Sequence, residues 1–206
     1  MSLRTVSVDY RLAPEHPYPA AFEDAYLAAS WIQEKYNSPI IVAGDSAGGN
    51  LAAAVCLKAR ESESIQIVQQ LLFYPCLSLQ MDTPSYKRHG EGYNLTSEEM
   101  RWFIDSYTPE VTMRKEPFAS PLLAVSHSRL PPAVIITAEY DPLHDDGLLY
   151  AKQLKDAGVE VYYKSYSGMV HSFFQMNGEV EAARIALDET IKQIKRGEYH
   201  LYTQTL

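Results

Sequence analysis

The chain has 206 residues, 46% of them hydrophobic, which is enough for one domain with a sizeable core and little more. Acidic residues outnumber basic residues by 26 to 18, and the net charge of −8 argues against nucleic acid or an anionic membrane as the main partner. No apolar run reaches the roughly 18 residues of a membrane span, and the N-terminus lacks the features of a signal peptide. The two cysteines, Cys56 and Cys76, fit no metal-binding pattern, so we expect a cytoplasmic protein in which both are buried and reduced.

Apolar runs alternate with helical patterns from one end of the chain to the other. Strands are predicted at residues 5–10, 39–44, 67–74, 133–138 and 159–166, and most of these segments are apolar runs next to Gly or Pro. Apolar residues at helical spacing predict helices within 22–32, from 47 past 55, within 96–107, from 145 to the stop signal Gly158, and within 180–194. This alternation predicts an α/β domain, 1–206, whose mostly parallel sheet is covered by helices on both faces.

The segment from about 77 to 120 interrupts this pattern, because it is polar and rich in Tyr, Pro and Gly. Its one predicted helix begins with a capping box formed by Thr96 and Glu99. The apolar stripe of that helix is formed by Met100, Phe103, Ile104 and Tyr107. An insertion of this kind in a parallel α/β domain is typical of a cap over a site, although a surface excursion without a role is the alternative.

A nucleophile is indicated by Gly44-Asp45-Ser46-Ala47-Gly48, which fits Gly-x-Ser-x-Gly and is followed by Gly49. The pattern comes directly after an apolar strand and directly before an apolar helix, which is the strand-turn-helix context that a nucleophile elbow requires. Such an elbow exposes the Ser46 hydroxyl above the sheet and directs the Ala47 amide, at the helix N-terminus, towards a developing oxyanion. The alternative is a glycine-rich turn with a serine that caps the helix.

A serine hydroxyl needs a base, and the base needs a group that orients it. His171 follows the last predicted strand in a loop beside Gly168, whereas none of the other five histidines has such a placement. Asp141 follows the strand 133–138 at the end where catalytic groups collect in open α/β sheets. The rival acids are Asp145 and Asp146, at the start of a helix, and Glu139, at the end of the strand. We therefore expect Ser46, Asp141 and His171 to form a catalytic triad.

Several motifs together resemble the hormone-sensitive-lipase-like family of carboxylesterases, an α/β-hydrolase family. The first is the block Asp9 to Glu15 with Pro17, Pro19, Ala20 and Ala21, and the second is the elbow 44–49. The others are Asp141-Pro142-Leu143 with Asp145 and Gly147, and Gly168 with His171 and Phe173, where Ser172 stands in place of the family's frequent Gly. The similarity extends from about Val6 to the last helix.

This resemblance implies hydrolysis of short- to medium-chain carboxylic esters through an acyl-enzyme on Ser46, with a small-molecule ester as partner and with no cofactor or metal. It implies that His171 acts as base and then as acid, and that Asp141 holds its tautomer. The block around Tyr10 and Arg11 would brace the domain. Tyr86, Tyr93, Trp102 and Phe103 would either line the substrate pocket or form the core of the cap, and the sequence leaves these two readings open.

The family also carries a His-Gly-Gly-Gly loop that donates further oxyanion amides, and this sequence contains no such motif. By the resemblance the chain starts at the family's fourth strand, so we expect an N-terminally truncated hydrolase with doubtful activity. Residues 5–10 would then lack their neighbour strand. Unpaired apolar edges favour self-association, so we predict a homo-oligomer through exposed sheet edges, or a rearranged first strand.

Two other functional classes stay open at this point. One is a non-catalytic small-molecule binder on the same fold, as in the plant gibberellin receptors, which look degraded at the catalytic histidine. The other is an inactive fragment, which the missing oxyanion loop favours. Amidase or lactonase activity is an alternative within the same chemistry.

Overall fold

The computed structural model describes residues 4–203, and their side chains as far as residue 194. Its sheet has four strands, β1 (Ile40–Asp45), β2 (Ile67–Phe73), β3 (Ala133–Tyr140) and β4 (Val161–Val170). All neighbouring strands are parallel, and their order in the sheet, β1-β2-β3-β4, is their order in the chain. The α/β class expected from the alternating pattern is confirmed.

Six α-helices connect and cover these strands among the described residues. They are α1 (Ala20–Tyr36), α2 (Ala47–Ser62), α3 (Pro84–His89), α4 (Ser97–Tyr107), α5 (His144–Asp156) and α6 (Glu181–Thr203). Short 3-10 turns occur at Val111–Lys115, Pro121–Leu123 and Phe173–Met176. Within residues 4–203, none of the helices combines the length and the apolar character that crossing a membrane demands.

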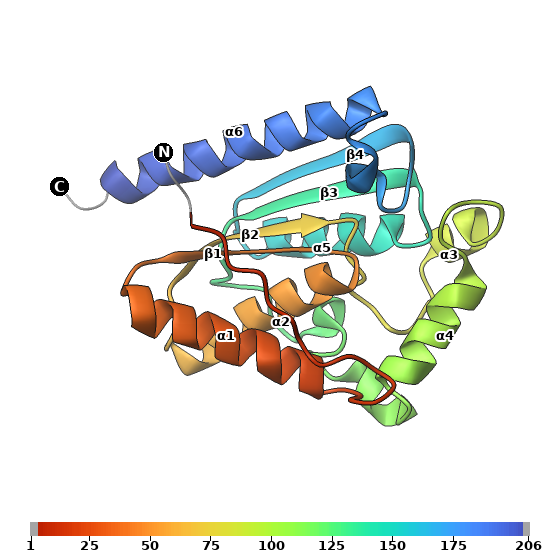
Figure 1. Cartoon of the computed structure of the whole chain (residues 1–206), viewed down its shortest axis with the longest axis horizontal. Helices are drawn as coiled ribbons and strands as arrows, with labels where there is room; N and C mark the ends of the chain where they lie inside the picture. The colour runs from red at the N-terminus through yellow and green to blue at the C-terminus, as the bar shows by residue number, and fades with distance from the viewer. Residues whose placement is uncertain (1–3, 204–206) are drawn as a thin grey trace.

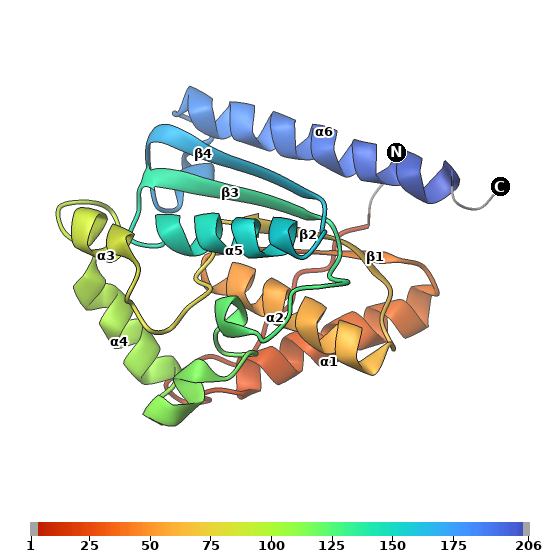
Figure 2. The same ribbon diagram turned by 180° about the vertical axis from the view of Figure 1, so that it is seen from behind.

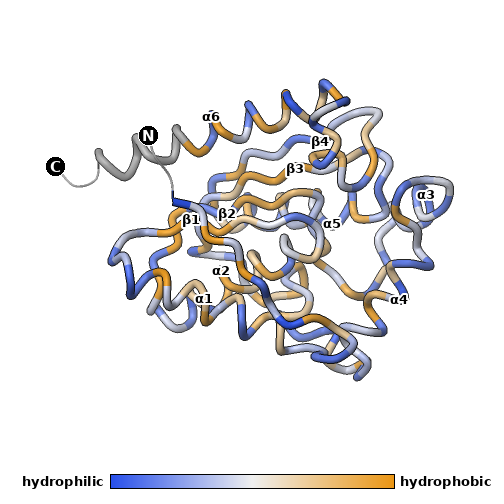
Figure 3. The backbone as a smooth tube through the Cα atoms, in the orientation of Figure 1, coloured by the Kyte–Doolittle hydropathy of each residue, from blue (hydrophilic) through white to orange (hydrophobic). Residues whose placement is uncertain are grey.

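Side chains of adjacent strand residues point to opposite faces, and each face has its own helices. Leu72 and Ile135 pack with residues of α2 and α5 in one buried cluster. Leu71 and Val134, one residue earlier in each strand, pack with residues of α6 in another. Figures 1 and 2 show α6 on one side of the sheet and α5 on the other, and Figure 3 shows the hydrophobic colouring along β3. The sheet is therefore the middle of three layers.

The predicted strand at residues 5–10 is wrong, because these residues form no strand and are not part of the described sheet. Side chains anchor this segment instead. The Arg4 guanidinium lies over the Tyr36 ring at 4.5 Å, and Arg11 binds the Asp24 carboxylate with its backbone amide and its guanidinium at 2.8–3.2 Å. A strand needs a neighbour for its backbone hydrogen bonds, and β1 takes its partner from β2. The segment therefore runs as an extended thread past α2 (Figure 1).

The segment 77–120 holds α3 and α4, which lie beyond the carboxyl ends of the strands (Figure 1). The capping box between Thr96 and Glu99 is present, so the predicted start of α4 is confirmed. Met100 and Ile104 of the predicted apolar stripe are buried, whereas Phe103 of the same stripe is 50% exposed. Met100 and Ile104, one turn apart, form the buried face, and Phe103 lies at its margin. The buried cysteines, Cys56 and Cys76, form no disulfide.

Candidate active site

The turn between β1 and α2 holds Ser46 in a strained conformation, with φ +51° and ψ −115°. A residue other than glycine adopts a positive φ at a cost, and such strain is typical of functional turns. Close packing enforces the turn, because a Cβ on Gly44 would lie 2.1 Å from the Gly48 carbonyl oxygen. A Cβ on Gly49 would lie 2.7 Å from the Cβ of Pro75, which follows β2. The two glycines therefore let strand, turn and helix pass in contact.

Ser46, His171 and Asp141 are connected by two hydrogen bonds. His171 Nε2 lies 2.9 Å from Ser46 Oγ, and His171 Nδ1 lies 2.7 Å from Asp141 Oδ2. The other carboxylate oxygen of Asp141 accepts the Leu143 amide at 2.8 Å, and Asp141 is fully buried. A carboxylate can only accept, so Nδ1 carries the imidazole proton and Nε2 is free to accept from the serine hydroxyl. The arrangement is that of a nucleophile, a base and a group that orients the base.

These three residues follow three of the four strands of the sheet. Ser46 follows β1, Asp141 follows β3 and His171 follows β4, each at the carboxyl end. Because all the strands are parallel, these ends lie at one edge of the sheet. The fold therefore collects residues that are far apart in the chain.

The elbow leaves the first amides of α2 without a partner in the helix, whose first hydrogen bond runs from the Asn50 amide to the Ser46 carbonyl. The Ser46 amide is engaged by the Phe73 carbonyl at 2.9 Å. Ala47 is the first residue of α2, where helical N–H groups have no partner within the helix. The side chain of Asp45 is exposed, and a Cβ on Gly48 would meet open space except for an Asp45 oxygen at 3.9 Å. The Ala47 amide is one of these unpaired groups at the N-terminus of the helix.

The three rival acids have other partners. Asp146 Oδ2 accepts the amides of Leu77 and Ser78, both at 3.0 Å, and Asp145 binds Arg88 at 2.9 Å. Glu139 accepts the Ser167 hydroxyl and the Gly168 amide, both at 2.7 Å. Each carboxylate therefore joins two segments of the chain near the site, and none of them bonds to His171 among the described residues.

The other histidines lie apart from the elbow. His16 is exposed, and His127 is buried against the Pro121 carbonyl at 3.0 Å. His89 and His144 line a separate cavity. The side chain of His200 lies outside the described residues.

Sequence patterns did not indicate two of the residues that contact His171. The Asn94 amide, from the loop between α3 and α4, donates to the His171 carbonyl at 3.0 Å. The Tyr74 ring stands edge-on to the imidazole with centroids 4.9 Å apart, and Tyr74 has a positive φ of 36°. Both residues are distant from His171 in the chain, so no spacing pattern could have indicated them.

A parallel sheet with a strained serine elbow and an acid and a histidine on the following strand ends is the arrangement of an α/β hydrolase. A sequence profile of the alpha/beta hydrolase fold family matches residues 1–175. The chain therefore belongs to this family. That membership confirms the resemblance seen in the motifs.

Its relatives include esterases from bacteria and archaea. The carboxylic ester hydrolase LipN of Mycobacterium tuberculosis is 41% identical over 85% of this chain and 51% of its own length. The ethyl acetate hydrolase of Pseudomonas putida is 34% identical over 93% of this chain and 62% of its own length. The structure of a hyperthermophilic esterase from the archaeon Pyrobaculum calidifontis aligns with a TM-score of 0.88 at 43% identity, over 91% of this chain and 64% of that one. The chain thus spans about half to two thirds of the length of these relatives.

Proposed function

We propose that this chain carries the catalytic triad of a serine carboxylesterase, with Ser46 as nucleophile, His171 as base and Asp141 as orienting acid. The observation that supports this most strongly is the continuous hydrogen-bonded path from Ser46 Oγ through the imidazole to Asp141, at 2.9 and 2.7 Å. Esterases that are 34–41% identical over most of this chain support the same reaction class.

The reaction follows from the atoms of the triad. His171 Nε2 takes the Ser46 proton while Oγ attacks the ester carbonyl carbon, and a tetrahedral oxyanion forms. The imidazolium then gives its proton to the leaving alkoxide, so the alcohol leaves and an acyl-serine forms. Water repeats the sequence, and the carboxylic acid is released. Asp141, fully buried beneath the imidazole, stabilises its positive charge in both steps.

The Ala47 amide is the oxyanion donor that we assign to the elbow. Loss of one such donor costs roughly 100- to 1000-fold in turnover in other serine hydrolases. The sequence contains no His-Gly-Gly-Gly motif, which supplies further donors in this family. We therefore expect slow turnover from the 206-residue chain.

The segment 77–120 is proposed as a cap on the substrate side of the site. Its α3 and α4 lie beyond the carboxyl ends of the strands, and Asn94 contacts the His171 loop. Tyr86 and Leu95 belong to a buried cluster that the segment shares with α1 and α2, whereas Trp102 and Phe103 are 61% and 50% exposed. Those two rings are therefore available to line an acyl pocket, and we propose short to medium acyl esters as substrates.

The test compares this chain with its Ser46→Ala variant on a short-chain chromogenic ester and with a fluorophosphonate label. The label reports an activated serine even when ester turnover is slow, because it needs only nucleophilic attack. We expect covalent labelling of the parent chain and none of Ser46→Ala. Equal labelling of both would place the reactive group elsewhere. Labelling of neither, in folded protein, would favour an inactive remnant or a non-catalytic binder.

We also propose that the chain self-associates through the open edge of the sheet. β1 pairs on one side with β2, and among residues 4–203 no strand pairs with its other side. Ala43 and Asp45 in this edge strand are exposed. Light scattering after gel filtration should give a mass above the 23.2 kDa of one chain, and a monomer across micromolar concentrations would contradict the proposal.

A cytoplasmic location stays a prediction.

A further inference from the structure

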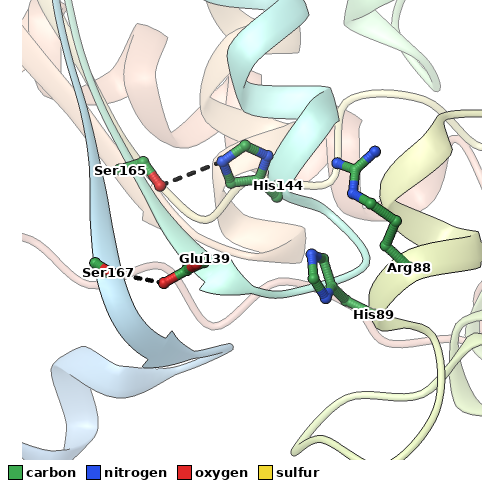
Figure 4. Close-up of a pocket in the computed structure, with 6 residues that line it drawn as sticks. All are labelled: Arg88, His89, Glu139, His144, Ser165 and Ser167. Atoms are coloured by element: carbon green, nitrogen blue, oxygen red, sulfur yellow. Dashed lines mark hydrogen bonds between the residues drawn. The ribbon is translucent and has the colours of Figure 1, made fainter.

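A polar cavity of about 460 Å³ lies at the ends of β3 and β4, beside α3 and α5. Figure 4 shows its walls. The lining residues are Arg88, His89, Glu139, His144, Ser165 and Ser167. None of them belongs to the proposed triad, so the cavity needs its own explanation.

Part of the lining is already hydrogen-bonded within the protein. His144 Nδ1 lies 2.8 Å from Asp145 Oδ1, and its Nε2 lies 3.2 Å from Ser165 Oγ. The Ser167 hydroxyl donates to Glu139 Oε2 at 2.7 Å. These groups hold one another in place, so they form fixed walls rather than free binding groups.

Three groups in the cavity keep unused hydrogen-bonding capacity among the described residues. Both bonds to Glu139 go to Oε2, which leaves Oε1 open. The Arg88 guanidinium uses only Nη2, towards Asp145, so Nε and Nη1 have no partner. The His89 Nδ1 atom is buried and makes no hydrogen bond. A buried polar atom without a partner is costly, and a ligand or a water molecule is the usual remedy.

The two charged groups with unused hydrogen-bonding atoms, Glu139 and Arg88, have opposite signs and come from different elements. The hydrogen bonds from Ser167 and Gly168 lower the pKa of Glu139, so this residue is anionic at neutral pH. Arg88, on α3, is always cationic and can serve two carboxylates on two edges of its guanidinium. Burial lowers the pKa of His89, which is the neutral group between them.

We propose that this cavity binds a small zwitterion, an amino acid with separated ammonium and carboxylate groups. The ammonium would donate to Glu139 Oε1, the carboxylate would accept from Arg88 Nε and Nη1, and the His89 ring would form the wall between them. A cation alone would leave Arg88 unused, and an anion alone would face Glu139 without compensation. The zwitterion matches both charges and adds no net charge to the site.

Occupancy of this cavity is connected to the proposed triad through the backbone. Glu139 stands two residues before Asp141, and its partners Ser167 and Gly168 precede His171 in the same strand. A ligand on Glu139 therefore contacts the strand ends that carry the acid and the base.

The test is calorimetric titration, which does not depend on catalysis. The probes are glycine, γ-aminobutyrate and ε-aminocaproate, with butylamine and butyrate as the two halves. At least one zwitterion should bind more tightly than either half. Glu139→Gln keeps an acceptor for Ser167 and Gly168 but removes the charge, and should weaken binding roughly 10- to 100-fold. The control is Glu160→Gln, an exposed change that should leave binding unaltered.

Arg88→Gln should weaken the binding of zwitterions and leave the binding of butylamine unchanged. Because it also removes the Asp145 ion pair, its thermal unfolding is measured beside the titration. If it does not fold, Glu139→Gln and the two half-ligands decide the question. The proposal is overturned if no zwitterion binds, if a half-ligand binds as tightly as every zwitterion, or if binding survives Glu139→Gln.

Discussion

The side-chain amide of Asn94 donates a hydrogen bond of 3.0 Å to the backbone carbonyl of His171. Asn94 lies between α3 and α4, so this bond joins the segment 77–120 to the loop of the proposed base. It leaves the imidazole free to reach Ser46 and Asp141. We therefore propose that Asn94 is a positioning residue, which would act on the proposed reaction only through His171.

Removal of this bond by Asn94→Ala should lower kcat while KM for a chromogenic ester stays nearly unchanged. The expected loss is about 3- to 10-fold, because one neutral hydrogen bond contributes about 1 kcal/mol. The rate of fluorophosphonate labelling at Ser46 should fall by a similar factor, which allows the measurement even at slow turnover. Glu91→Gln, an exposed change in the same loop, is the control. A variant with parental rates would show that His171 needs no support from this segment.

Gly44→Ala should be among the most damaging single-methyl changes in the chain. Its Cβ would lie 2.1 Å from the Gly48 carbonyl oxygen and 2.7 Å from the Gly49 nitrogen, both of which are backbone atoms. The turn cannot yield without moving Ser46, so we expect a loss of roughly 3 kcal/mol of stability and of serine labelling. Gly178→Ala adds the same methyl where nothing lies within 4 Å. Urea unfolding of the two variants is the comparison, and equal midpoints would refute the close approach.

Stability should depend on pH through Asp146. Burial raises the pKa of Asp146 from 3.8 to about 7, although the amides of Leu77 and Ser78 act in the opposite direction. The folded chain therefore holds a proton that the unfolded chain releases above about pH 4. The corresponding stability is complete below pH 3.8 and is lost as the pH rises through about 7.

Asp146→Asn should remove this dependence, because the amide is neutral at every pH. The stability advantage of the parent over the variant should shrink by roughly 2 kcal/mol between pH 5 and pH 8. Thermal unfolding at several pH values measures it. The control is Asp188→Asn, at an exposed position of α6, whose stability should change with pH as that of the parent does. A parent advantage that grows with pH would mean that the carboxylate is ionised in the fold.

Asn50→Ala tests how α2 is attached to the segment 77–120. The buried Asn50 amide donates to the carbonyls of Cys76 and Ala119, at 2.8 and 2.9 Å, which stand at the two ends of that segment. Truncation leaves both carbonyls without a partner, and we expect a loss of about 3 kcal/mol in chemical unfolding. Asn177→Ala, at an exposed position, removes a single partly buried bond to the Phe174 carbonyl and should cost well under half as much.

The parts of the fold that depend on local sequence could be predicted, and those that depend on distant partners could not. Each of the four observed strands follows an apolar run bounded by Gly or Pro, and the start of α4 follows from Thr96 and Glu99. Residues 5–10 also have a composition typical of a strand, yet they form none because pairing is not a local property.

The candidate site shows the same division. The placement of Ser46, Asp141 and His171 at strand ends follows from chain order in a parallel sheet, and the structure brings the three together. The contacts of Asn94 and Tyr74 with His171 depend on how two loops meet in space. The spacing placed Phe103 in an apolar stripe with Met100 and Ile104 but could not distinguish a buried ring from an exposed one, and the structure leaves Phe103 half exposed.

The strand order β1-β2-β3-β4 also has a consequence for how the chain folds during synthesis. Each new strand joins the edge of the sheet that the preceding residues have already built, so no later strand has to be inserted between two earlier ones. The sheet can therefore grow from one side as the chain leaves the ribosome, N-terminal part first. His171 follows the last strand to be added, so the serine elbow and its acid are in place before the base arrives.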